Sequence, residues 1–426
     1  MESSRNRQNN TNRVVLYMYG VPRKSSSGAY LRFYSNCRAY LDLGFQVEVV
    51  QVVTEPDVSA AAPELPVTWT HVVANPPPRS VMGALMYRAG YPGEAAAAYY
   101  FARHTAVRRE AMLRERQYPG CLHQFENFCE SPIPFLSGIN TIWSCHDVGS
   151  EVVALSNRID QTLASRGASI PERRELRFIR NFERRVARNS RLIVCITPKD
   201  RDAIRSEWGY LNVEHLPMSI PDVPAVVDRT DWVRSERLNL LHVGAIAHLP
   251  TYRSLEFLLT EVFPRLRTEV LERISLRVAG EILADNSRCQ RILALCTLYP
   301  QVQLLGKVPD LLPFYASSDL QVAASTEATG LRTRVVESFG FGLPVLSTTA
   351  ACRGVAGIRS GENIVLADTA EAWVQALESI LKSPSQLSRL ARNARATYDT
   401  MHSPTVVAAA LASFLTKYFT TESPLV

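Results

Sequence analysis

Short apolar runs rich in β-branched residues recur along the chain and alternate with segments of helical periodicity. Such runs are typical of parallel strands buried on both faces, and the intervening helices provide the crossovers. The series occurs twice, with a proline-rich stretch at 217–224 between the two halves, and 426 residues are too many for one compact core. The sequence therefore predicts an α/β protein with two doubly wound domains, joined by a linker, whose ligand lies in the cleft between them at strand carboxyl ends.

The expected elements follow from this alternation. In the first half we expect strands at 13–19, 46–53, 140–145, 192–197 and 213–216, and helices at 29–43, 106–117 and 172–189. In the second half we expect strands at 238–243, 274–279, 302–305, 320–323, 344–347 and 363–366, and helices at 252–266, 286–298, 331–341, 370–381, 386–398 and 405–419. The segment 56–78, rich in proline and alanine, is expected to be irregular.

The composition indicates the cellular compartment of the protein and the role of its cysteines. No apolar run approaches the ~18 residues that span a bilayer, and the N-terminus lacks the hydrophobic region of a secretory signal, so we expect a cytoplasmic protein. The eight cysteines are scattered without a close C-x-x-C pair, which argues against a structural zinc site and a redox dithiol. No oligomeric state is predicted.

Positive charge is concentrated in one predicted helix. Residues 172–191 carry eight arginines and three glutamates, whereas the whole chain has a formal charge of only +6. Such a helix is either a solvated surface or a peripheral contact with anionic lipid at the inner membrane face or with an acidic partner. The arginines are not interleaved with stacking aromatics, so nucleic-acid binding is not expected.

A second cluster of charges surrounds the start of the predicted helix at 331–341. Gly330 permits close approach of the backbone, Arg332 and Arg334 could neutralise phosphates, and free amides of the first turn favour anions. Glu337, one turn later, could accept hydrogen bonds from the vicinal hydroxyls of a ribose. The pattern is typical of a nucleoside-diphosphate site, although an ordinary amphipathic helix with solvated charges has the same spacing.

Several segments carry a family resemblance in the same order along the chain. They read Gly330-Leu-Arg-Thr-Arg334-Val-Val-Glu337, then Gly342-Leu-Pro344-Val345, preceded by Leu241-His-Val-Gly244, Arg277-Val-Ala-Gly280 and His146-Asp147. Together they resemble the GT-B-fold glycosyltransferases, and within them the large retaining group called family 4. Arg334 stands where many members of that family have lysine.

The resemblance implies a GT-B architecture with an acceptor-side Rossmann-like domain at 1–222, a nucleotide-sugar-binding Rossmann-like domain at 223–402 and a terminal helix, 403–426, that packs back on the first domain. It implies transfer of a sugar from a nucleoside-diphosphate-sugar donor to the hydroxyl of a glycan, lipid-linked or small-molecule acceptor, without a cofactor or metal. His146 and Glu327 are implied at the reacting centre. The implied donor ligands are Gly28, Gly244, Arg253, Thr329, Gly330, Leu331, Arg332, Arg334 and Glu337.

Two departures from the family pattern keep alternatives open. The first of two family carboxylates, eight positions before Glu337, is replaced by Thr329, with Glu327 two residues earlier. The turn after Gly244 lacks the usual Arg and Lys pair. A non-catalytic nucleotide-sugar-binding partner of another transferase and a GT-B-fold nucleotide-sugar epimerase therefore remain alternatives. Inverting relatives of this family place a basic histidine just after the first strand, and residues 20–28 contain none, so the resemblance implies retention at the anomeric carbon.

Overall fold

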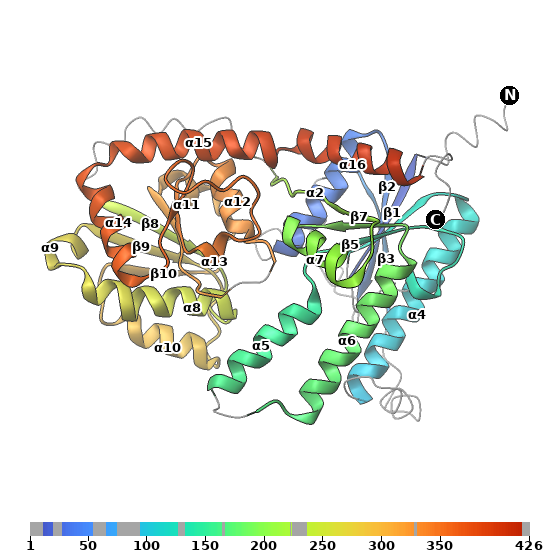
Figure 1. Cartoon of the computed structure of the whole chain (residues 1–426), viewed down its shortest axis with the longest axis horizontal. Helices are drawn as coiled ribbons and strands as arrows, with labels where there is room; N and C mark the ends of the chain where they lie inside the picture. Colours follow the sequence, from blue (N-terminus) through green and yellow to red (C-terminus); the bar gives the residue numbers. More distant parts are fainter. Residues whose placement is uncertain are drawn as a thin grey trace. The chain divides into compact units, whose positions relative to one another are not determined.

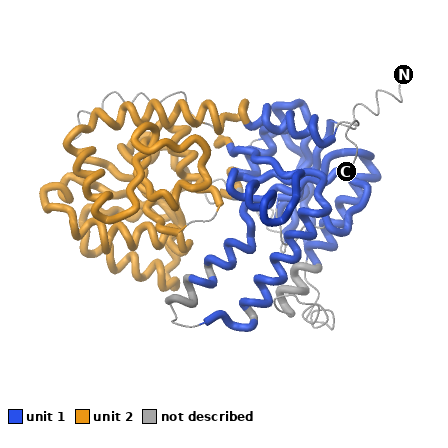
Figure 2. The backbone as a smooth tube through the Cα atoms, in the orientation of Figure 1, with its two compact units in different colours: residues 1–23, 32–218, 407–426 blue, residues 24–31, 219–406 orange. Residues whose placement is uncertain are grey.

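The computed structural model describes residues 12–19, 28–53, 65–74, 94–126, 133–163, 167–221, 223, 237–327 and 330–419. The chain forms two compact units, one from 1–23, 32–218 and 407–426 and the other from 24–31 and 219–406 (Figure 2). Each unit has its own parallel sheet with helices around it (Figure 1). The predicted fold class, two doubly wound Rossmann-like α/β domains, is therefore confirmed.

The sheet of the first unit has the strand order β3-β2-β1-β4-β5-β6-β7, and all of its neighbouring strands are parallel. The strands are β1 (Arg13–Tyr19), β2 (Gln46–Val53), β3 (Thr68–Val73), β4 (Leu122–Phe125), β5 (Asn140–Cys145), β6 (Leu192–Cys195) and β7 (Val213–His215). The expectation that 56–78 is irregular was wrong for β3. This strand lies at the edge of the sheet and is largely exposed, so it has no continuous apolar run.

The sequence analysis also did not predict strand β4. Its four residues, Leu-His-Gln-Phe, are all buried, but two of them are polar and break the apolar pattern. Buried polar side chains are tolerated when they find hydrogen-bond partners. His123 contacts the hydroxyl of Tyr17 at 2.9 Å, and Gln124 accepts a hydrogen bond from the hydroxyl of Tyr40 at 2.6 Å. These partners come from β1 and from a helix, so only the tertiary structure stabilises the strand.

The helices of the first unit cover both faces of its sheet. They are α2 (Gly28–Asp42), α4 (Glu94–Gln117), α5 (Gly149–Leu163), α6 (Ile170–Asn189), α7 (Pro198–Trp208) and α16 (Pro404–Phe419), with a 3₁₀ turn at Ile133–Phe135. Val15 of β1 packs in one core with Val107 of α4 and Val186 of α6. On the opposite face, Val14 packs in a second core with Phe33 of α2 and Leu411 of α16. Alternate residues of one strand therefore bury helices on opposite faces.

The sheet of the second unit has the order β10-β9-β8-β11-β12-β13 and is also parallel. Its strands are β8 (Leu238–Val243), β9 (Ile274–Ala279), β10 (Val302–Gly306), β11 (Leu320–Ala323), β12 (Val345–Ser347) and β13 (Val365–Leu366). Its helices are α8 (Leu249–Phe257), α9 (Thr268–Leu271), α10 (Ser287–Cys296), α11 (Leu312–Ser317), α12 (Thr333–Gly340), α13 (Thr349–Cys352), α14 (Ala370–Lys382) and α15 (Ser385–Met401). Helix α8 continues through a π turn, Leu258–Val262, and a 3₁₀ turn, Phe263–Arg265. None of the described helices is long and apolar enough to span a lipid bilayer.

Candidate active site

A pocket lies where three neighbouring strands of the second unit end. Gly244 follows β8, Gly280 follows β9, and Lys307 follows β10. The backbone pairing continues into these loops, because Gly244 N donates to Ala279 O and Gly280 N donates to Gly306 O, both at 2.9 Å. The carboxyl ends of parallel strands are where open α/β sheets bind their ligands.

The two glycines of this edge leave no room for side chains. A Cβ atom on Gly280 would lie 1.8 Å from the carbonyl oxygen of Gly244. A Cβ atom on Gly244, whose φ is +155°, would lie 2.4 Å from Oγ1 of Thr251. Glycine is therefore required at 280 for the two loops to approach each other and at 244 for the first loop to approach Thr251 of α8, and the backbone of both stays accessible to a ligand.

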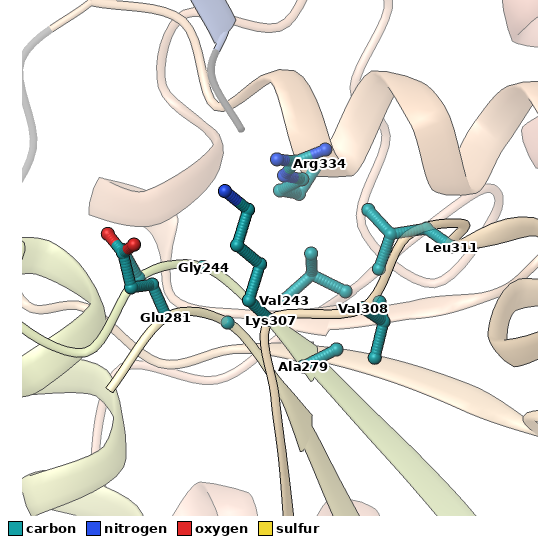
Figure 3. Close-up of a pocket in the computed structure, with 10 residues that line it drawn as sticks. Val243, Gly244, Ala279, Glu281, Lys307, Val308, Leu311 and Arg334 are labelled. Carbon is teal, nitrogen blue, oxygen red and sulfur yellow. The ribbon is translucent and has the colours of Figure 1, made fainter. Parts of the chain in front are cut away.

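The pocket has about 440 Å³ of empty space, including the part that opens to solvent. Figure 3 shows Lys307 with its ammonium group extended toward Arg334, and the Glu281 carboxylate to one side of that ammonium group. Sequence reasoning missed Lys307 and Glu281 as site residues. Each stands within two residues of a strand's carboxyl end, and that position was the available signal. The pocket is lined by Val243, Gly244, Ala245, Ala279, Gly280, Glu281, Lys307, Val308, Leu311 and Arg334.

Arg334 and Glu337 form a buried pair on α12. Nη1 of Arg334 donates to Oε2 of Glu337 at 2.6 Å, and the hydroxyl of Tyr315 donates to the same oxygen at 3.2 Å. Burial opposes the positive charge of Arg334, but Glu337 and Tyr315 outweigh burial and raise the arginine pKa. Arg334 therefore remains charged, and its orientation is fixed by a carboxylate that is only 7% exposed.

The start of α12 lies next to two glycines. Arg332 occupies the N-cap position, and its side chain makes no capping hydrogen bond. Gly330, two residues earlier, has a φ of +61°, a conformation that favours glycine. Gly28 also lies here, because a Cβ atom on it would lie 2.8 Å from Cγ2 of Thr333, the first residue of α12. Two amides of the first turn donate to backbone oxygens, Thr333 N to Leu331 O at 3.1 Å and Val335 N to Arg332 O at 3.0 Å. The helix dipole still favours negative charge at this end of α12.

In the first unit, His146 follows β5 and lies beside a buried carboxylate. Its Nε2 atom is 2.7 Å from Oε2 of Glu126, the residue that follows the neighbouring strand β4. The His146 side chain is 22% exposed, whereas that of Glu126 is 3% exposed. The imidazole therefore reaches solvent while the carboxylate behind it does not. Sequence reasoning named His146 and missed Glu126, which stands in the same position relative to its strand.

Residues 237–383, which include the pocket and α12, match the family model described as glycosyl transferases group 1. The similarity to group 1 glycosyl transferases therefore lies in the second unit. This match confirms the predicted enzyme class, a glycosyltransferase, whereas membership of the retaining family 4 stays a prediction. No curated protein sequence matches the chain.

Solved structures share the fold of the whole chain at low sequence identity. Sucrose-phosphate synthase from Thermosynechococcus elongatus has a TM-score of 0.68 at 16% identity, over 96% of this chain and 99% of that chain. HepE from Anabaena, in complex with UDP and glucose, has a TM-score of 0.62 at 12% identity, over 95% and 99%. WaaG, a glycosyltransferase involved in lipopolysaccharide biosynthesis, has a TM-score of 0.61 at 16% identity, over 96% and 100%. The chain therefore has the GT-B fold.

The transferase domain does not bring all the expected donor ligands to its pocket. Arg253 lies on α8 outside the lining and pairs with Glu256 at 2.9 Å. Glu327 is exposed, and its backbone oxygen accepts a hydrogen bond from the hydroxyl of Ser325 at 2.6 Å. The backbone oxygen of Leu331 accepts from the amide of Thr333 at 3.1 Å, just before α12. Thr329 lies outside the described residues.

The carboxylate of Glu126 is held by several donors. Nδ2 of Asn36 donates to both of its oxygens, at 2.8 and 3.0 Å, and Nε2 of Gln124 donates to Oε1. Burial alone would raise the Glu126 pKa, but the hydrogen bond and charge of His146, together with Arg32, lower it below its usual value. Glu126 is therefore an ionised, fixed acceptor that orients the imidazole of His146.

Two further carboxylates of the first unit have raised pKa values. Glu183 of α6 accepts hydrogen bonds from the backbone amides of Gly149 and Ser150 at the start of α5, at 2.6 and 3.2 Å. Burial outweighs these bonds and raises the Glu183 pKa to about 7. Asp200 accepts a hydrogen bond from the hydroxyl of Thr197 at 2.7 Å, and burial raises its pKa to about 6. Both groups titrate near neutral pH and so affect stability there.

Proposed function

We propose that the protein transfers a sugar from a nucleoside-diphosphate-sugar donor to an acceptor hydroxyl, with retention at the anomeric carbon and without a metal. The observation that carries the proposal is the Arg334–Glu337 pair at the start of α12, beside a glycine-walled pocket. A cation and a carboxylate one turn apart complement the two halves of a nucleoside diphosphate, its phosphates and its ribose.

The pocket has the charges that a departing diphosphate needs. Lys307 and Arg334 both line it, and the dipole of α12 adds positive potential at the start of that helix. Fixed positive groups of this kind stabilise a leaving diphosphate electrostatically, which is the role a metal would otherwise have. Lys307 thereby compensates for the Arg and Lys pair that is missing after Gly244.

Glu337 has one oxygen for the protein and one for the ligand. The bonds from Arg334 and Tyr315 both end on Oε2. We assign Oε1 to the vicinal hydroxyls of the donor ribose, which donate hydrogen bonds to an ionised carboxylate. Arg334 then holds the carboxylate in place while its remaining N–H groups face the phosphates.

We assign His146 to a polar contact with the donor sugar or the acceptor hydroxyl, oriented by Glu126. The Nε2 atom of His146 is engaged by Glu126, so the opposite ring nitrogen, Nδ1, is the atom available to substrate. For Glu327 we retain only the proposal that its loop approaches the transferred sugar, in place of the carboxylate that Thr329 replaces.

For the acceptor side we propose peripheral contact of a cytoplasmic protein with anionic lipid through α6. The arginines at 173, 177, 180, 184, 185 and 188 of this helix are exposed, whereas its residues at 179, 182, 183, 186 and 187 are buried. An outer face with this charge binds anionic membranes in a salt-dependent manner. Sedimentation with vesicles of anionic and of neutral lipid, at low and high salt, tests it, and equal binding to both lipids would contradict it.

The first experiment on the donor is a thermal-shift screen with UDP, GDP, dTDP and their sugars. A ligand that binds only the folded state raises the melting temperature. HepE was solved with UDP and UDP-glucose, so UDP is the first nucleotide to test. A selective rise with one nucleotide is expected, and no rise with any of them would contradict donor binding.

Donor hydrolysis, followed by NMR of the released sugar, separates catalysis from binding alone. Release of the donor's own anomer before mutarotation supports retention, whereas the opposite anomer contradicts it. A donor that binds but is never hydrolysed would favour the non-catalytic alternative. Interconversion of the donor sugar without release would favour the epimerase.

A further inference from the structure

We propose that Glu115, Cys121 and His123 form a zinc site that joins the end of α4 to the start of β4. Oε2 of Glu115 lies 3.1 Å from Nε2 of His123, and Sγ of Cys121 lies 3.2 Å from the same nitrogen. The three ligand atoms all lie within 4.8 Å of one another. Cysteine sulfur, histidine nitrogen and carboxylate oxygen are the three ligand types that proteins use for zinc.

The two distances from Nε2 of His123 to the other ligand atoms are close to those expected around one zinc ion. Zinc bonds of about 2.3 Å to sulfur and about 2.0 Å to nitrogen and oxygen place tetrahedral ligands roughly 3.3–3.5 Å apart. The two distances at Nε2 differ from these values by a few tenths of an ångström. A small rotation of the Glu115 side chain completes a site of three protein ligands, with water as the fourth ligand.

Without a metal, the three groups of this cluster make hydrogen bonds to one another. Nε2 of His123 carries at most one hydrogen, yet both a carboxylate oxygen and a sulfur contact it. That hydrogen points at one neighbour, and the thiol hydrogen of Cys121 serves another contact, in a region where Cys121 and His123 are fully buried. A cation between the three atoms replaces these hydrogen bonds with bonds to the metal, and binding it releases the thiol proton of Cys121 to solvent.

The surroundings hold the ligands in the orientation that a metal requires. The hydroxyl of Tyr17 lies 2.9 Å from Nδ1 of His123, so with zinc on Nε2 the Nδ1 hydrogen has an acceptor. The amide of Gly120 donates to Oε1 of Glu115 at 2.9 Å, which leaves Oε2 for the metal. The Glu115 side chain is 21% exposed and gives the ion a path from solvent.

This site is separate from the proposed reaction. Cys121 and His123 lie at the amino end of β4, whereas Glu126 follows its carboxyl end. The sequence argued against structural zinc because the chain has no C-x-x-C pair. The fold supplies the third ligand instead, since the turn at 118–120 returns the chain so that Glu115 faces Cys121-x-His123. We therefore assign the metal to the connection between α4 and β4, away from the proposed reaction, with one coordination position held by water.

The experiment uses the full chain, purified under reducing conditions, stripped with a chelator and reloaded with zinc or cobalt. We expect close to one zinc per chain after gel filtration, a higher melting temperature with zinc, and a thiolate-to-cobalt charge-transfer band in the cobalt form. Cys121→Ser and Glu115→Gln are expected to lower zinc affinity by about 10- to 100-fold or more, and Cys121→Ser to abolish the charge-transfer band. Glu115 is partly exposed, so Glu115→Gln is expected to fold.

Cys296→Ser is the matched control, because Cys296 is a half-buried cysteine of α10 in the other unit. It is expected to keep the zinc stoichiometry and the cobalt band of the unmodified protein. Wild-type protein that binds neither metal would overturn the proposal. So would equal zinc binding by the wild type, Cys121→Ser and Glu115→Gln.

Discussion

Arg334 donates a hydrogen bond of 2.6 Å to Glu337 across one turn of α12, so the two residues that the sequence assigned to different parts of a donor are bound to each other. The pair orders both groups before a ligand arrives, because Tyr315 holds the same carboxylate oxygen from α11. Removing either Arg334 or Glu337 therefore has two effects. It deletes a contact to the ligand, and it leaves the other buried charge without its partner.

Replacing Arg334 by alanine should weaken binding of the nucleoside diphosphate that gives the largest thermal shift. The loss of one charged hydrogen bond costs about 2 kcal/mol, roughly 30-fold in Kd. Titration calorimetry measures it, with Arg359→Ala as a control because Arg359 is exposed, pairs with Glu362 and lies outside the pocket. Unchanged nucleotide affinity in Arg334→Ala would contradict the assigned role.

Glu337→Gln should leave the protein folded but lower its nucleotide affinity by about 10-fold or more, because a neutral amide accepts ribose hydrogen bonds less strongly than a carboxylate. The variant should also melt at a lower temperature, since Arg334 loses its buried counter-charge. Calorimetry with the nucleoside diphosphate and with inorganic diphosphate distinguishes the roles. A larger loss of affinity for the nucleoside diphosphate than for inorganic diphosphate is expected, and equal affinities of wild type and variant for the nucleoside diphosphate would show that the ribose contact is wrong.

Gly280→Ala should disrupt the pocket and destabilise the transferase domain by about 1–3 kcal/mol or more, because the added methyl group would lie 1.8 Å from the oxygen of Gly244. Chemical denaturation and nucleotide thermal shift measure the two effects. Gly167→Ala is the control, since nothing lies within 4 Å of a Cβ atom there. Normal stability and nucleotide binding in Gly280→Ala would refute the close approach of the two loops.

His146→Ala and Glu126→Gln should each slow donor turnover by roughly 10- to 100-fold, because both remove one oriented hydrogen-bonding unit. The double variant should be no slower than His146→Ala alone, since Glu126 acts through the imidazole. Donor hydrolysis measures the rates, and nucleotide thermal shift should be unchanged in all three variants. Multiplicative losses in the double variant would exclude the positioning role of Glu126.

Glu183 should make the first unit less stable as pH rises. Its pKa is raised from 4.5 to about 7 in the folded protein, so the folded state binds a proton more tightly than the unfolded state. This stabilisation is complete below pH ~4.5 and is lost as pH rises through about 7, with a total of roughly 3 kcal/mol. Asp200 contributes in the same direction up to about pH 6.

The test compares Glu183→Gln with the wild type in melting experiments from pH 5 to pH 8. Glutamine keeps an acceptor for the amides of Gly149 and Ser150 but cannot ionise, so the stability of the variant relative to wild type should increase with pH. Glu362→Gln, on an exposed loop of the second unit, should show a constant difference. A pH-independent difference for Glu183→Gln would rule out the raised pKa.

The sequence alone was enough to predict the positions of most strands that are buried on both faces of a sheet. β1, β2, β5, β8, β9 and β11 have the bounds expected from their apolar runs, and α12 lies within the range predicted from its charges and periodicity. These features are local, because a continuous apolar run or a 3.6-residue period is visible within one segment. The block from Gly330 to Val345 contributed the most specific part of the family resemblance for the same reason.

The tertiary structure alone decided which polar side chains meet. Glu126 reaches His146, Lys307 extends toward Arg334, and Glu115 contacts His123 only because parallel strands and returning turns bring separate segments together. The same applies to β3 and β4, whose residues lack an apolar run and are stabilised by neighbouring strands. A sequence pattern records the periodicity of one element, whereas a site depends on the spacing between elements, which packing of the whole sheet determines.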